Sequence, residues 1–265
     1  MDLLLILKTI IMGIVEGATE FLPISSTGHL IIAGDVLGFL TKDKRDVFEI
    51  IIQLGAILAV VWQYRTKVLH VTTNLSEPKS QQLILNLFIA FLPLAIIGLA
   101  FHHQIKALLF NPKSVAIALI IGGFIILWIE KKLPKVSVTS VDDMDWKHAV
   151  KIGFAQAIAL IPGASRAAST IIGGMVFGLS RTVATEFSFF LAIPVMFAAT
   201  AYDLYKSKGL LASDDVWVFL IGFITAFIAA LVVIKVLIRY IANHNFAIFA
   251  WYRIAFGALV LFYYW

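Results

Sequence analysis

Two acidic residues stand four positions apart in an apolar stretch near the amino terminus, and a polar run follows them at once. The string EGATEFLPISSTGH places Glu16, Glu20, Ser26 and His29 within fourteen residues. An acid at the centre of a membrane helix costs about 2.5–3.5 kcal/mol on insertion scales, so a chain keeps it there mainly for function. On one helix, Glu16 and Glu20 would present both carboxylates on the same stripe.

Two neighbouring carboxylates repel each other unless a cation or a shared proton lies between them. Oxygen-rich pairs suit a hard divalent ion such as Mg²⁺ or Ca²⁺, with waters and a substrate phosphate completing its coordination shell. The sequence therefore predicts a divalent-cation site at Glu16 and Glu20. The alternative is that one acid is protonated and merely hydrogen-bonded within a helix bundle.

A second polar segment, PGASRAAST, begins at Pro162. Pro162 and Gly163 should end one helix, and the amides that open the next helix near Ser165 should be unpaired, at the positive end of the helix dipole. Arg166 adds a planar, permanently charged group suited to bidentate phosphate contact, and Thr170 adds a hydroxyl. This pattern predicts an anion-binding site. The alternative is an arginine at headgroup level with ordinary helix-capping hydroxyls.

A cation site facing an anion site is typical of phosphoryl chemistry, in which positioning and charge stabilisation dominate the rate. Ser26 or His29 could act as the nucleophile, or His29 could be the acid or base for an attacking water. The sequence leaves these alternatives open. The predicted catalytic residues are Glu20, Ser26, His29 and Arg166.

The composition indicates which elements must position these side chains. Hydrophobic residues make up 61% of the chain and charged residues 14%, and the mean hydropathy is +0.95, which is far from a soluble domain. The chain has no cysteine, and it has no clustered basic segment of the kind that would indicate nucleic-acid binding. About 20 apolar residues cross a hydrocarbon core of roughly 30 Å, which predicts an all-α polytopic membrane protein with about six transmembrane helices. The apolar stretches are 48–64, 82–101, 113–130, 182–204, 215–238 and 246–264.

Two further apolar regions, 2–40 and 147–180, are broken by proline, glycine and hydroxyl residues. Irregular backbone at membrane depth is tolerated only where it is buried in protein or lines a wet cavity. We therefore predict that each region forms a re-entrant helix-loop-helix hairpin.

The two broken regions resemble each other. GIVEGATEFLPISS aligns with GFAQAIALIPGASR, with Glu16 over Gln156 and Ser25 over Ser165. A long apolar stretch that starts near an acid follows each, as FEIIIQLGA and EFSFFLAIP. The pattern indicates an internal duplication.

The duplication predicts pseudo-repeat halves of about 1–130 and 131–265 within one integral membrane domain, 1–265. One hairpin and three spans per half is an odd number of crossings, so the second half would be inverted relative to the first. Inverted repeats with broken helices near the midplane build a central polar site.

The loops give a weak indication of orientation. The segments 65–81 and 131–151 hold eight Lys and Arg residues, against seven in 41–46, 102–113 and 205–214. The positive-inside rule then predicts that the first set is cytoplasmic and that the amino terminus is outside.

EGATEFLPISSTGH and IPGASRAAST, in this order and in a chain of this length, resemble the undecaprenyl-diphosphate phosphatase family, also called bacitracin-resistance proteins. The resemblance extends over essentially the whole chain. It implies a bacterial membrane enzyme that removes the terminal phosphate of the C55 polyprenyl diphosphate and returns the monophosphate carrier to cell-wall synthesis. It further implies a divalent cation, a multi-pass protein of the plasma (inner) membrane with its active site toward the periplasm, and an inverted repeat.

The family's motifs carry over to particular positions. They fall on Glu16 and Glu20 for the ExxxE motif, on Ser26 and His29, and on Pro162, Gly163, Ser165, Arg166 and Thr170 for the PGxSRSxxT motif. The resemblance thereby implies Ser26, Ser165, Arg166 and Thr170 as phosphate-binding residues. One position departs from the family, because Ala167 stands where a serine is usual; Ser169 lies two residues further and would face another side of the helix.

The competing interpretation is a polyprenyl-phosphate flippase or transporter, since inverted repeats with broken helices are above all a transporter design. Glu16 and Glu20 would then bind a coupling ion or proton, and Arg166 would hold an anionic headgroup without cleaving it. A purely structural scaffold would leave the buried acids unexplained. The sequence leaves open whether the protein is a homodimer.

Overall fold

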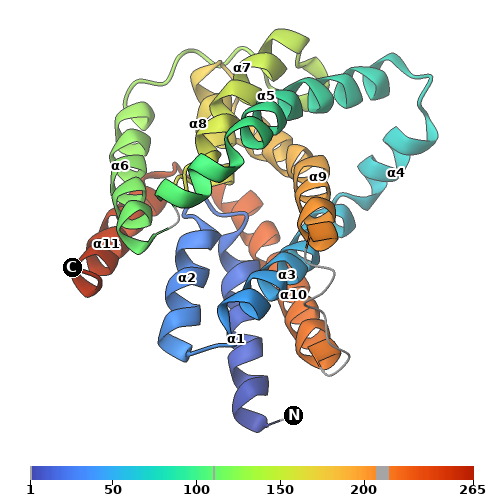
Figure 1. The fold of residues 1–265 in the computed structure, drawn as a ribbon. Helices are drawn as coiled ribbons and strands as arrows, with labels where there is room; N and C mark the ends of the chain where they lie inside the picture. The colour runs from blue at the N-terminus through green and yellow to red at the C-terminus, as the bar shows by residue number, and fades with distance from the viewer. Residues whose placement is uncertain (1, 110, 207–214) are drawn as a thin grey trace.

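The computed structural model describes residues 2–109, 111–206 and 215–265, which fold almost entirely as helices (Figure 1). In chain order these are α1 (Leu3–Thr19), α2 (Ser26–Leu37), α3 (Lys42–Gln63), α4 (Arg65–Thr73), α5 (Pro78–Leu109), α6 (Pro112–Glu130), the 3₁₀ turn η1 (Val141–Asp143), α7 (Trp146–Ala157), the 3₁₀ turn η2 (Ile158–Leu160), α8 (Arg166–Val176), α9 (Arg181–Lys206), α10 (Val216–Ile241) and α11 (Ala247–Tyr263).

Five of the described helices are long and apolar enough to cross a membrane: α3, α5 as far as Phe101, α6, α9 and α10. They coincide with five of the six predicted spans, although α3 begins already at Lys42 because its charged first turn continues the helix. The sixth, 246–264, forms α11, which has 17 residues and belongs with the shorter apolar helices. The prediction of an all-helical, multi-pass membrane protein is confirmed, and the sixth span stays a prediction.

Large apolar side chains cover the outer faces of these helices. Trp128 on α6, Val236 on α10 and Phe262 on α11 are 59%, 60% and 88% exposed. Extended exposed apolar surface marks a membrane or partner interface rather than a free aqueous surface. The interior instead holds an apolar core around α9, with Phe187 and Phe189 fully enclosed.

Both broken regions contain the expected interruption. α1 gives way to α2 across residues 20–25, and η2 gives way to α8 across 161–165. Ile161 has φ −81° and ψ 114°, the extended backbone that a following proline favours. Gly163 has φ +92°, a conformation that costs glycine little.

The N-cap residue just before the second helix of each broken region has a strained backbone. Ser25, the N-cap of α2, has φ +71°, and Ser165, the N-cap of α8, has φ +73°. A non-glycine residue in this region costs on the order of 1–3 kcal/mol, and such residues cluster at active sites and ligand clamps. The two serines are also the pair that the sequence alignment superimposes.

Glycines bring the broken helices close to their neighbours. α1 packs along α10, and α7 packs along α5 (Figure 1). A Cβ on Gly13 would lie 2.8 Å from the Gly222 carbonyl oxygen, and one on Gly153 would lie 2.8 Å from the Ala90 carbonyl oxygen. Backbone therefore meets backbone at both contacts, which holds the two breaks in the interior.

Candidate active site

A buried salt bridge joins the two breaks. Glu20 caps the end of α1, Arg166 is the first residue of α8, and Arg166 Nη2 donates to Glu20 Oε1 at 2.9 Å. The side chain of Arg166 is only 11% exposed and that of Glu20 only 7%. Removing one partner of such a pair leaves an uncompensated buried charge, which typically costs about 3–5 kcal/mol.

The other oxygen of Glu20 accepts a hydrogen bond from Ser26. Ser26 is the first residue of α2, it is buried, and its hydroxyl donates to Glu20 Oε2. One carboxylate thus binds a hydroxyl from the first break and a guanidinium from the second. A carboxylate that accepts from a serine hydroxyl is placed to take its proton.

Arg166 is oriented by α9 and by an aromatic ring. Its Nη1 donates to the Ser188 carbonyl oxygen at 3.1 Å, and its guanidinium carbon lies 5.6 Å from the centre of the Phe21 ring. Its Nε is buried without a hydrogen-bond partner. One donor of this side chain is therefore free for a further acceptor.

Glu16 lies one turn before Glu20 and differs from it in its surroundings. The residue is 1% exposed, and neither carboxylate oxygen has a hydrogen-bond partner. A buried carboxylate without partners is costly unless it binds a proton or a cation. Glu16 is the most conspicuous unsatisfied group of the site.

His29 contacts α11 and the first break. Its Nδ1 lies 2.7 Å from the Ser25 carbonyl oxygen and its Nε2 lies 2.7 Å from the Tyr252 hydroxyl, while its ring stacks on Phe256 with centroids 4.1 Å apart. A carbonyl oxygen only accepts, so Nδ1 carries a proton, and in the neutral ring Nε2 accepts from Tyr252. Both nitrogens are thus engaged with groups other than the Ser26 hydroxyl, which bonds to Glu20.

The hydroxyls of α8 make local bonds. Ser165 Oγ caps α8 by accepting from the Ala168 amide at 3.1 Å. Thr170 Oγ1 donates to the Arg166 carbonyl oxygen at 2.9 Å and lies 2.6 Å from Ser188 Oγ. In this conformation Thr170 fastens α8 to α9, and its predicted phosphate contact stays a prediction.

Comparison with known proteins identifies the family of the chain. The model of the bacitracin resistance protein BacA family matches residues 9–259. The chain belongs to this family. It is 59% identical to the undecaprenyl-diphosphatase of Nitrosospira multiformis over 98% of this chain and 96% of that protein, and 58% identical to that of Dechloromonas aromatica over 98% and 95%. The undecaprenyl-diphosphatase of Methylobacillus flagellatus is 58% identical over the full length of both chains.

The position at which the resemblance leads us to expect a serine is enclosed in the core. Ala167 is fully buried among apolar residues. Ser169 donates to the Ser165 carbonyl oxygen at 2.9 Å, so its hydroxyl is engaged within α8. The Glu20–Arg166 contact forms without a hydroxyl at position 167.

Arg253 and Tyr252 are not among the residues predicted from the sequence. Arg253 is fully buried and donates to backbone carbonyls from both breaks, and Tyr252 holds His29. The signal was present, because Arg253 is a lone charge inside the apolar stretch 246–264, and such a charge marks function. Tyr252 carried no comparable signal, since tyrosines are common near membrane surfaces.

The cation site at Glu16 and Glu20 stays a prediction, and it would need ligands beyond these two acids. Among the described residues, no group of three or more His, Cys, Asp or Glu side chains is arranged to hold a metal ion. The unpartnered oxygens of Glu16, together with Glu20, are oxygen ligands of the kind that Mg²⁺ and Ca²⁺ prefer. Mg²⁺ in particular keeps several waters and binds one or two carboxylates plus phosphate.

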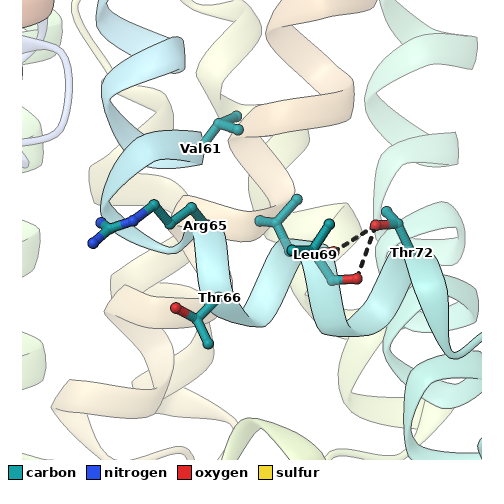
Figure 2. A pocket seen from close by; sticks show the side chains of 6 residues that line it. Val61, Arg65, Thr66, Leu69 and Thr72 are labelled. Atoms are coloured by element: carbon teal, nitrogen blue, oxygen red, sulfur yellow. Dashed lines mark hydrogen bonds between the residues drawn. The ribbon is translucent and has the colours of Figure 1, made fainter.

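An open hollow elsewhere on the molecule is not part of this site. Figure 2 shows it where α3 passes into α4, lined by Val61, Arg65, Thr66, Val68, Leu69 and Thr72. The Thr72 hydroxyl donates to carbonyl oxygens of its own helix, at Val68 and Leu69. None of the predicted site residues lines the hollow.

Proposed function

We propose that this protein hydrolyses undecaprenyl diphosphate to undecaprenyl phosphate and inorganic phosphate, and so recycles the lipid carrier of peptidoglycan synthesis. The observation that carries the proposal is the Glu20 carboxylate, which binds the Ser26 hydroxyl on one oxygen and Arg166 on the other. Relatives at 56–59% identity named undecaprenyl-diphosphatase support hydrolysis over lipid transport.

Binding of the diphosphate places a new anion beside Arg166. The guanidinium exchanges its contact with Glu20 for the phosphate oxygens, to which its planar donors are matched. Glu20 then keeps Ser26 as its hydrogen-bond donor and becomes free to act as a base.

The Ser26 oxygen attacks the terminal phosphorus, and its proton passes to Glu20. The bond from this phosphorus to the bridging oxygen breaks, and undecaprenyl phosphate leaves with that oxygen. Water then attacks the phosphorus of the phosphoserine, and the bond from this phosphorus to the Ser26 oxygen breaks. Glu20 returns its proton to the Ser26 oxygen, and inorganic phosphate leaves with the oxygen and the protons of the water. Arg166 stabilises the charge that develops on the transferred phosphoryl group.

A divalent cation at Glu16 and Glu20 would neutralise phosphate charge when it is bound. The support for it is the buried Glu16 carboxylate without partners. His29 orients the first break, since its ring bonds to the Ser25 carbonyl oxygen next to Ser26.

We further propose that the two broken regions are re-entrant hairpins. The chain before α7 and the chain after α8 are hydrogen-bonded to each other, from Ser137 N to the Gly178 oxygen at 2.8 Å and from Ser180 N to the Val138 oxygen at 3.0 Å. Entry and exit of the second region therefore lie together, as expected when both lie on one side of the membrane.

The inverted repeat is supported by reciprocal packing. The first helix of each broken region packs on the second apolar helix of the other half, α1 on α10 and α7 on α5. Ser25 and Ser165 share a left-handed backbone at aligned positions. The homodimer stays an open alternative.

We also propose that the active site opens toward the periplasm of the inner membrane, as the resemblance to the family implies. Ion pairs support the grouping of the loops into two sides. Lys67 binds Asp142 at 2.6 Å, which joins the two segments predicted to be cytoplasmic. Lys44 binds Asp215 at 2.7 Å, which joins the two ends predicted to be outside. Each pair links segments assigned to the same side.

Phosphate release by the purified protein in detergent tests the function, with C55 diphosphate as substrate and Mg²⁺, Ca²⁺ or chelator added. We expect metal-dependent release that Glu20→Gln and Arg166→Ala reduce by at least about 10³-fold. In detergent there is no gradient, so a flippase without phosphatase activity would release nothing. Absence of release from folded wild-type protein would refute the proposal and favour lipid transport.

A further inference from the structure

Arg253 is the most completely enclosed charged residue among those that the structure describes. It lies on α11, is fully buried, and forms no ion pair with a described carboxylate. Its five N–H groups donate to five backbone carbonyl oxygens, so the whole donor capacity of the guanidinium is used. A buried arginine without a carboxylate is expensive, and a chain keeps one for a reason.

The five acceptors come from three different segments. Nη1 donates to Pro23 at 3.1 Å, in the first break, and to Ala164 at 2.9 Å, in the second. Nη2 donates to Gly163 at 3.0 Å, in the second break. The remaining two bonds go to α6, from Nη2 to Ala118 at 3.2 Å and from Nε to Leu119 at 3.3 Å.

The contacts at the two breaks lie two or three residues before Ser26 and Arg166 in the chain. Pro23 precedes the strained Ser25 and the hydroxyl of Ser26, and Ala164 precedes the strained Ser165 and the guanidinium of Arg166. A single rigid, planar group therefore fixes the spacing between the two breaks. Lysine has three donors at one point and would not span them.

We infer that Arg253 is a positioning residue of the phosphatase, which holds the Ser26 and Arg166 breaks in register so that both reach Glu20. The inference rests on the proposed function for its catalytic consequence. A displacement of about 1 Å in a catalytic group can cost about 100-fold in rate. The relative position of the two breaks should therefore affect kcat more than KM.

Two substitutions disturb this residue in different ways. Arg253→Lys keeps the positive charge but loses the planar guanidinium with its five donors. Gly122→Ala keeps the arginine itself, but the added Cβ would overlap the guanidinium of Arg253, with Cζ only 2.8 Å away. Because alanine favours a helix over glycine, Gly122→Ala should not unfold α6. Arg181→Lys is the matched control, since Arg181 pairs with Glu130 away from both breaks.

The test measures kcat and KM of phosphate release per folded molecule. We expect kcat to fall about 100-fold in Arg253→Lys and about tenfold in Gly122→Ala, with KM within about threefold of wild type. Arg181→Lys should stay within about twofold in both constants. Unchanged kcat per folded molecule in both variants, or a rise in KM alone, would overturn the role.

A second measurement does not depend on activity. The chain has no cysteine, so spin labels can be placed at Val36→Cys and Val176→Cys, two exposed positions near the ends of α2 and α8. We expect one narrow distance in wild type and a shifted or broadened one in Arg253→Lys. An unchanged distribution would refute the positioning role, whereas a wild type that releases no phosphate would refute the proposed function alone.

Discussion

Glu20 carries a different donor on each carboxylate oxygen, and this division distinguishes it from Glu16. Ser26 and Arg166 satisfy Glu20, while Glu16 is buried with both oxygens unpartnered. Two identical side chains four residues apart therefore have different roles available. Glu20 is placed to take the proton of a hydroxyl, and Glu16 is the acid that we propose to bind the cation.

Substitution of Ser26 should distinguish it from His29 as the nucleophile. We expect Ser26→Ala to lower kcat by at least about 10³-fold, because it removes the attacking oxygen. His29→Gln should lower kcat only about tenfold, through loss of the contact that orients Ser25. Rapid-quench labelling should detect a phosphoserine in wild type. Residual activity in Ser26→Ala that matches wild type would assign the attack to water or to His29.

Substitution of Glu16 should act through the cation. We expect Glu16→Gln to raise the Mg²⁺ concentration for half-maximal activity at least about tenfold, equivalent to about 1.4 kcal/mol of binding free energy. Calorimetry with the metal alone should show the same loss of affinity. Glu186→Gln is the control, since Glu186 is an acid within α9 that lies outside the proposed cation site. Identical metal dependence in wild type and Glu16→Gln would remove Glu16 from the cation site.

At the scale of elements, the site depends on how closely α1 approaches α10. A Cβ on Gly17 would overlap the Ala226 carbonyl and lie 2.8 Å from the Ala230 amide nitrogen. Gly17 lies between Glu16 and Glu20 in the chain, so a shift of α1 at this point would move both acids.

Gly17→Ala should therefore destabilise the protein although alanine is the better helix former. Overpacking of this kind costs about 1–3 kcal/mol, against roughly 0.5–1 kcal/mol gained in helix propensity. We expect a lower unfolding midpoint in detergent and reduced activity. Gly98→Ala on α5 is the control, because its nearest neighbour is the end of the flexible Leu160 side chain at 3.3 Å. Equal midpoints for the two variants would contradict the close-contact argument.

At the scale of the whole molecule, contacts between distant segments fit a chain that crosses the membrane repeatedly and turns back twice. Glu130 pairs with Arg181 and also accepts from the Phe246 amide at 2.8 Å, which joins three turns that the proposed topology puts on the cytoplasmic side. Tyr264 donates to Asp35 at 3.0 Å, which joins the carboxyl-terminal end of the chain to the end of α2, both on the side that we propose to be periplasmic.

Single cysteines should report this topology, because the natural chain has none. We expect a membrane-impermeant thiol reagent to label Asp43→Cys in intact spheroplasts, and to label Thr139→Cys and Thr182→Cys only after permeabilisation. Thr139 and Thr182 flank the second broken region, and all three positions are exposed. Labelling of Thr139→Cys and Thr182→Cys from opposite sides would show that the second region spans the membrane.

The sequence by itself determined the helical, multi-pass character of the protein and the places where its helices break. Hydropathy is summed over neighbouring residues, and Pro23, Pro162 and Gly163 act on their own backbone, so these features are local. The spacing of Glu16 and Glu20 likewise fixed their common face on α1.

Only the tertiary structure decided which polar groups meet. Arg166 reaches Glu20 across 146 residues, His29 bonds to Tyr252 while the Ser26 hydroxyl bonds to Glu20, and Arg253 binds both breaks through backbone carbonyls. Every residue carries a carbonyl oxygen, so a sequence does not show which carbonyls will accept a hydrogen bond. A charged residue likewise does not specify which residue of opposite charge it will pair with. Packing of α1 on α10 and of α7 on α5 selects the partners, because it brings the two breaks together at one buried point.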